Sequence, residues 1–146
     1  MSFQELIRTQ LETPPVTESD LKQVQSAIKT IFPNEYLDFL KVADGGLWNN
    51  ERVIMYSCGN AMPQDDRLLA ANLNRPDAKL LFIGRFSEDE FGYLLEGISP
   101  DTKIIYVFDH ETDEIHQIAS DMTDFFTQFS LPPEEKKKGL FSFLFS

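Results

Sequence analysis

The stretch FPNEYLDFLKVADGG, residues 32–46, decides how the N-terminal third of the chain folds. Its Phe32-Pro33-Asn34 start interrupts a preceding helix, because proline disfavours helical backbone in the residue before it. Asn34 is suited to cap a new helix, with Glu35 in the first turn. Apolar residues follow at helical spacing, and Asp44-Gly45-Gly46 ends the helix, since glycine adopts the left-handed conformation at low cost. The stretch therefore predicts a short helix between a proline break and a double-glycine stop.

Two further helices are expected before this stretch. Residues 3–12 carry apolar side chains near helical spacing and end at Pro14-Pro15. Thr17 is a good N-cap, with acidic residues in the turn after it, and apolar residues then recur at steps of three and four as far as Ile31. The first 46 residues are therefore predicted to be largely helical.

The remainder of the chain reads mostly as strands. Strands are predicted where β-branched and aromatic residues cluster, at 52–57, 80–83, 91–97, 104–108 and 114–118. The last two are expected to form a hairpin around a polar turn at 109–113. Residues 64–74 predict a short helix, and Ser120 is expected to cap a C-terminal helix that ends before Pro132-Pro133. Grouped strands predict an α+β fold, with a mainly antiparallel sheet and the N-terminal and C-terminal helices packed against it.

Length and composition are those of one globular domain. The chain has 146 residues, of which 42% are hydrophobic, which is enough to build a core. We assign 1–133 to a single domain and 134–146 to a tail, charged at 134–138 and rich in phenylalanine at 139–146. Three interpretations of the tail stay open: it docks on its own domain, it pairs with the sheet edge of another subunit, or it touches a membrane surface.

The sequence predicts a cytoplasmic protein. The N-terminus lacks the basic and apolar regions of a secretory signal, and no apolar run is long enough to span a bilayer. Cys58 is the one cysteine, so the chain forms no internal disulfide and no four-cysteine zinc site.

Negative charge is concentrated in one part of the chain. The net charge is −11, yet residues 1–85 contribute only −2, from 11 acidic and 9 basic residues. Residues 86–133 contribute −10, because Lys103 is the one basic residue among 11 acidic ones. Such a field repels nucleic acid and anionic membranes and attracts basic partners, although an acidic surface also serves solubility alone.

Few residues point to catalysis. The polar run 109–116 holds carboxylates and two histidines that could bind a metal or transfer protons, but alternate residues of a hairpin face opposite sides, and a solvated turn explains them. The spacing of the residues assigns no general base to Cys58. The sequence contains no phosphate-binding loop, no glycine-rich dinucleotide-binding motif and no Gly-x-Ser-x-Gly nucleophile motif. We therefore expect no enzyme and no cofactor. Trp48 is either an edge of the core, which we favour, or an interface residue.

Several segments together resemble the SUKH superfamily, which includes a yeast cell-wall-synthesis regulator and many bacterial immunity proteins. The resemblance runs from about Thr17 to Phe129 and leaves out the tail. The segments that carry it are 32–40 with 44–46, then 82–84, 91–93, 105–111 and 118–126. Two residues depart from the family pattern: Tyr93 stands where an aspartate or asparagine is usual, and Met122 where an aromatic residue or leucine is usual.

The resemblance implies a compact α+β domain with no known catalytic residues. Bacterial members typically neutralise a toxin, often a nuclease, whose basic groove suits an acidic partner. We therefore expect a protein-binding domain whose cognate partner is a basic toxin domain. The candidate contact residues are Glu88, Asp89, Glu90, Asp101, Asp109, Glu111, Asp113, Glu114 and Trp48. The alternatives are a regulatory scaffold that assembles as a homo-oligomer through the tail, and a metal-binding enzyme using residues 109–116 with or without Cys58.

Overall fold

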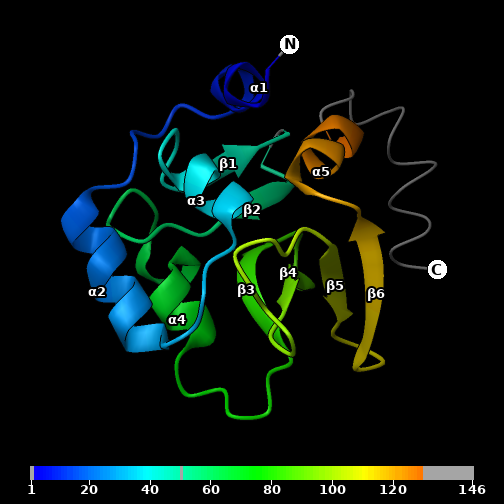
Figure 1. The fold of residues 1–146 in the computed structure, drawn as a ribbon. Helices are drawn as coiled ribbons and strands as arrows, with labels where there is room; N and C mark the ends of the chain where they lie inside the picture. The colour runs from blue at the N-terminus through cyan, green and yellow to red at the C-terminus, as the bar shows by residue number, and fades with distance from the viewer. Residues whose placement is uncertain (1, 50, 130–146) are drawn as a thin grey trace.

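The computed structural model of the chain describes residues 2–49 and 51–129 and has an α+β fold (Figure 1). The predicted tail, 134–146, lies outside the described residues. The helices are α1 (Phe3–Gln10), α2 (Glu18–Ile28), α3 (Asn34–Leu40), the 3-10 turn η1 (Gln64–Asp66), α4 (Leu68–Asn72) and α5 (Met122–Phe129). The strands are β1 (Gly46–Trp48), β2 (Val53–Met55), β3 (Leu80–Arg85), β4 (Glu90–Leu94), β5 (Ile105–Asp109) and β6 (Glu114–Ala119).

The strands form one sheet in the order β1-β2-β3-β4-β5-β6, and all neighbours pair antiparallel. Each strand therefore pairs with the next one along the chain, which puts β1 and β6 at the two edges. The predicted hairpin is present, with Asp109 opposite Glu114 at its closed end. The expected α+β class, with N-terminal helices and a C-terminal helix around an antiparallel sheet, is confirmed.

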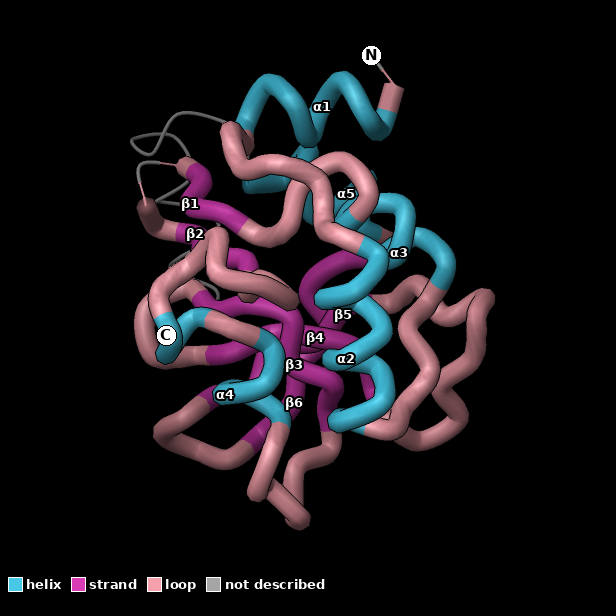
Figure 2. The backbone as a smooth tube through the Cα atoms, turned by 90° about the vertical axis from the view of Figure 1, so that its left-hand side faces the viewer, coloured by secondary structure: helices cyan, strands magenta, loops and turns pink. Residues whose placement is uncertain are grey.

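Aromatic side chains fill the layer between the sheet and helices α1, α3 and α5. Phe125 of α5 contacts Phe91 of β4 with ring centroids 4.8 Å apart, and Phe126 contacts Trp48 of β1 at 4.5 Å. Tyr36 of α3 lies 6.1 Å from Tyr93 of β4. Helices α2 and α4 lie side by side, at the left of Figure 1 and in front of the strands in Figure 2, far from edge strand β6.

Helix α3 ends at Leu40, before the double glycine that was expected to end it, and Gly45-Gly46 instead leads into β1. Gly45 has φ 76°, and a Cβ there would lie 2.6 Å from the Met55 carbonyl oxygen, so only glycine fits. Both carboxylate oxygens of buried Asp44 accept hydrogen bonds from the backbone, from Cys58 N–H at 2.7 Å and Gly59 N–H at 3.1 Å. Asp44 thereby fixes the loop after β2 beside the start of β1, a short strand that the sequence did not predict.

Three further predicted helix boundaries were wrong. Pro33 occupies the cap position of α3, and Asn34 is its first helical residue, whose N–H donates to the Pro100 carbonyl oxygen at 2.8 Å. Helix α2 stops at Ile28, because Lys29 adopts the left-handed conformation with φ 60°. At α5 the Asp121 carboxylate accepts the Asp124 N–H at 2.7 Å, so Asp121, and not Ser120, provides the cap.

Candidate acidic interface

The meander brings two acidic turns to the same end of the sheet. The turn between β3 and β4, residues 86–89, and the turn between β5 and β6, residues 110–113, both follow strands that run in the same direction. The two turns are joined by a hydrogen bond from His110 N–H to the Asp89 carboxylate at 2.9 Å. We call this end of the sheet, with Glu88–Glu90 and Asp109–Glu114, the acidic end.

Four carboxylates of the acidic end are exposed: Glu88, Glu111, Asp113 and Glu114. Glu114 lies 3.4 Å from the imidazole of His116. Within residues 2–49 and 51–129, no lysine or arginine forms an ion pair with Glu88, Glu111 or Asp113. These charges are therefore free to act on a partner that approaches this end.

Asp109 shapes the hairpin turn. Its carboxylate accepts the Glu111 N–H at 2.9 Å, and this backbone hydrogen bond holds the pKa of Asp109 below its ordinary value. The carboxylate therefore stays ionised at neutral pH while it fixes the turn that carries Glu111 and Asp113. Asp89 has a similar structural role, because its buried side chain connects the two turns.

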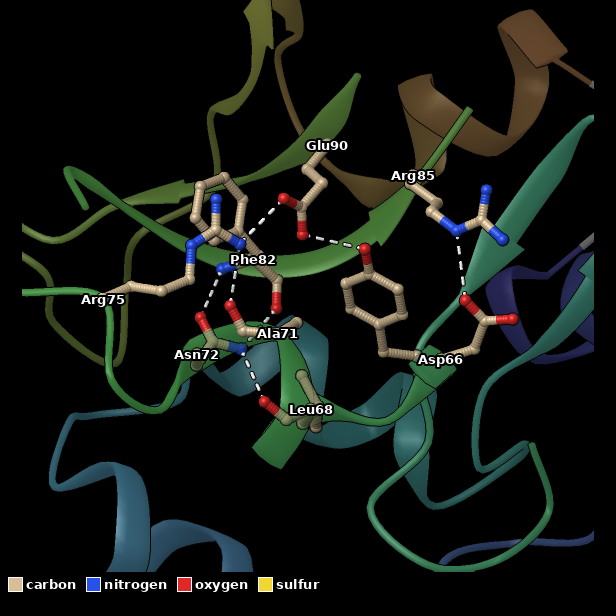
Figure 3. A network of polar contacts seen from close by, with 9 residues as sticks. Asp66, Leu68, Ala71, Asn72, Arg75, Phe82, Arg85 and Glu90 are labelled. Atoms are coloured by element: carbon tan, nitrogen blue, oxygen red, sulfur yellow. Dashed lines mark hydrogen bonds and ion pairs between the residues drawn. The ribbon is translucent and has the colours of Figure 1, made fainter. Parts of the chain in front are cut away.

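Glu90 is neutralised within the protein. Its carboxylate pairs with Arg75 at 2.7 Å and accepts a hydrogen bond from the Tyr56 hydroxyl at 2.8 Å (Figure 3). Burial raises the pKa of Tyr56, so this hydroxyl remains a donor. Arg75 also lies over the Phe82 ring, 4.2 Å from its centroid, and donates to the Ala71 carbonyl oxygen at 2.9 Å. Glu90 thus anchors the loop after α4 to the sheet and contributes little free charge.

A second arginine reaches the same region from β3. Arg85 donates through Nε to the Asp66 carboxylate at 3.0 Å (Figure 3) and through a terminal nitrogen to the Ser87 carbonyl oxygen at 2.6 Å. Between these two arginines runs an open groove of about 460 Å³, which Glu88 and His110 also line. Arginines from the first 85 residues therefore balance Glu90 and Asp66 and leave the exposed turn carboxylates uncompensated.

The comparison with protein families matches residues 15–128 to the model of the SMI1 / KNR4 family (SUKH-1). The chain belongs to this family. The match covers α2, α3, α4, the whole sheet and nearly all of α5, and leaves out α1. A comparison with curated protein sequences gave no match.

Two of the residues expected at the interface lie elsewhere in this SUKH-1 domain. Asp101 sits in the loop between β4 and β5, at the opposite end of the sheet, with exposed Glu96 in the same loop. Trp48 is only 2% exposed, and its indole N–H donates to the Gln10 side chain. Trp48 is therefore a core residue, as the sequence favoured, and offers almost no exposed surface to a partner.

Tyr93 is a core residue as well. The sequence left open how the surface looks at this departure from the family pattern, but Tyr93 is fully buried and its hydroxyl donates to Glu35 at 3.0 Å. Glu35 also accepts the Met122 N–H at 3.2 Å, so one carboxylate connects α3, β4 and the start of α5. The sequence placed Glu35 in the first turn of a helix. It gave no signal for this role in the core, because β4 and α5 lie more than fifty residues away in sequence.

Cys58 and the two histidines give little basis for catalysis. Cys58 is buried, and burial raises the pKa of its thiol to about 12, which disfavours the reactive thiolate. Across the described residues, histidine, cysteine and carboxylate side chains form no group of three or more that could hold a metal ion. The same part of the chain contains no helix that is long and apolar enough to cross a membrane.

The buried position of Glu35 predicts a pH-dependent stability. Removal of solvent raises the pKa of Glu35 from 4.5 to about 7, against the lowering effects of its hydrogen bonds and Lys103. The folded state therefore keeps a proton that the unfolded state loses, and this stabilisation is complete below pH 4.5 and is lost as pH rises through 7. We expect the free energy of unfolding to fall between about pH 4.5 and 7, by less than the full 1.4 kcal/mol per pH unit that one proton would give, because solvent screens this partly exposed group.

Urea denaturation of the protein and of Glu35→Gln at several pH values measures this effect. Glutamine keeps an acceptor for Met122 N–H but does not titrate, so the variant should show a flatter pH dependence. The other titratable groups are the same in both proteins, so the comparison isolates residue 35. Parallel pH profiles for the two proteins would contradict the assignment.

Proposed function

We propose that this SUKH-1 domain is a non-catalytic immunity protein that binds and neutralises a cognate toxin, with the acidic end as its contact surface. The observation that carries the proposal is the convergence on one end of the sheet of exposed carboxylates from two turns, which no lysine or arginine of the described residues pairs with. Family membership supports a protein partner as the target. A basic substrate groove, such as that of a nuclease, is the surface that this charge pattern fits.

The arrangement favours fast association. Carboxylates gathered at one end attract a basic surface over about 10 Å at moderate ionic strength. The hydrogen bonds of Asp89 and Asp109 hold both turns in place before binding, so little conformational entropy is lost when a partner arrives. A toxin whose groove is covered in this way is kept from its substrate.

Charge-reversal variants test whether the toxin binds the acidic end or the acidic surface as a whole. In Glu88→Lys with Glu111→Lys, association with the toxin should slow about tenfold or more at low salt, and the difference should shrink at high salt. The matched control is Glu96→Lys with Asp101→Lys, which makes the same change in net charge at the opposite end of the sheet. Surface plasmon resonance at several ionic strengths gives both association rates.

The partner for this measurement is the protein encoded beside this gene, co-expressed and purified with the domain. Equal slowing in the two double variants would show that only total charge matters and would remove the acidic end from the mechanism. If the neighbouring protein is no toxin and does not bind, the immunity function itself is wrong.

A further inference from the structure

The face of the sheet opposite α5 carries an apolar groove. Along β5, Ile105 and Val107 point into the core, whereas the alternate residues Tyr106 and Phe108 are only half-buried. Phe108 lies opposite Ile115 of β6, which is also half-buried. In the described residues 2–49 and 51–129, this part of the sheet thus stays partly open to solvent. We call it the outer face.

The groove lies where the outer face meets the loop after α4. Its volume is about 430 Å³, and its apolar floor consists of Leu80, Phe82, Phe108 and Ile115. Phe82 and Phe108 meet edge to face with ring centroids 6.4 Å apart. The charged residues that line the groove are Arg75, Asp77, Lys79 and Asp113, the last of which belongs to the acidic end. An apolar floor with charged residues in its lining suits a segment that combines aromatic and basic residues.

We propose that the C-terminal segment 139–146 of this same chain docks in this groove. The segment reads Gly-Leu-Phe-Ser-Phe-Leu-Phe-Ser, so its phenylalanines at 141, 143 and 145 fall on one side of an extended strand. Edge strand β6 offers an open edge beside the groove for such a strand. The three lysines at 136–138 come immediately before the segment and match the carboxylates of the β5–β6 turn.

The chain is long enough to reach the groove. Helix α5 lies over β4 on the opposite face, because Phe125 contacts Phe91 and Phe129 contacts Phe86 at 4.9 Å. Phe129 contacts Phe86, just after β3, so edge strand β6 is three strand spacings away, about 14 Å, and passing around the edge adds about another 10 Å. Nine residues separate Phe129 from Gly139, and the ten Cα–Cα steps between them span about 33 Å when extended. No other part of the fold has to move.

Cysteine cross-linking in the full-length chain tests the docking. Ile115→Cys is combined in turn with Phe141→Cys, Phe143→Cys or Phe145→Cys and oxidised with diamide. A disulfide needs Cβ atoms about 4 Å apart, so at least one pair should close within a single chain. The matched control is Ile31→Cys with the same tail cysteines, since Ile31 is 46% exposed on the loop after α2, far from β6. Natural Cys58 is buried and stays out of the reaction.

We expect the disulfide of at least one groove pair to form about tenfold faster than that of any control pair. A free tail of this length would not give such a difference. Equal rates for groove and control pairs would overturn the proposal. Disulfides between two chains would also overturn it and identify a second copy as the occupant. Monomers and cross-linked dimers separate on non-reducing gels.

A second measurement leaves the folded domain unchanged. The three tail phenylalanines are replaced by serine in the full-length chain, and methyl NMR signals are compared with those of the natural protein. The Ile115 signal should shift, whereas the Ile31 signal should not. An unshifted Ile115 signal would overturn the docking and leave the proposed toxin binding untouched, because that function depends on the acidic end alone.

Discussion

Trp48→Ala is expected to lower the free energy of unfolding by about 4 kcal/mol. The indole packs against Phe126 at 4.5 Å and Phe125 at 5.9 Å, in the layer where β1, α1 and α5 meet. Truncation leaves a cavity between these elements and leaves the Gln10 side-chain oxygen without its hydrogen-bond donor. Denaturant unfolding followed by circular dichroism measures the loss.

Trp48→Phe is the matched control, because it keeps an aromatic ring and loses mainly the hydrogen bond to Gln10. Its cost should be about 1–2 kcal/mol. Binding of the toxin by the folded fraction should be unchanged in both variants, since Trp48 lies in the core. A folded Trp48→Phe protein with a large loss of affinity would instead place Trp48 in the interface.

Asp44→Ala is expected to cost about 3 kcal/mol of stability. The substitution removes the acceptor of two backbone N–H groups, those of Cys58 and Gly59, and at least the first is then buried without a partner. Leaving a buried donor unsatisfied costs about 1–3 kcal/mol, and more when the lost acceptor is charged. Thermal and denaturant unfolding give the change.

Asp44→Asn tests whether geometry or charge matters at this position. Asparagine keeps one carbonyl oxygen in place, so it should recover part of the loss, while its amide cannot accept the second N–H. A loss below about 1 kcal/mol for Asp44→Ala would mean that the loop after β2 holds its place without this side chain.

The helices at 3–12, 17–31 and 32–46 were predictable because their signals are local. A cap, a helical repeat of apolar residues and a proline or glycine stop all lie within one short window. Boundaries were less accurate, and the Lys29 conformation that ends α2 has no local signal. Strand β1 was missed because three residues between Gly45 and Asn49 carry no alternation, and only pairing with β2 makes them a strand.

The acidic end was predictable in composition but not in shape. Charge counts identified residues 86–133, yet they could not show that Asp101 lies at the far end of the sheet or that Glu90 is paired with Arg75. Both facts depend on strand order and on the position of the loop after α4. The roles of Glu35 and Tyr93 in the core were missed for the same reason.

The sequence by itself determined the α+β class, the family, the hairpin and the part of the chain that holds the negative charge. Each of these depends on residue patterns within short segments or on the number of charged residues in a segment. Tertiary structure alone decided which carboxylates remain free. Antiparallel pairing places alternate turns at opposite ends of the sheet, so the turns that hold Glu88 and Glu111 share one end and the loop that holds Asp101 lies at the other. Arg75 and Arg85 neutralise Glu90 and Asp66, from which they are separated by fifteen or more residues in sequence. No local sequence pattern predicts these pairs.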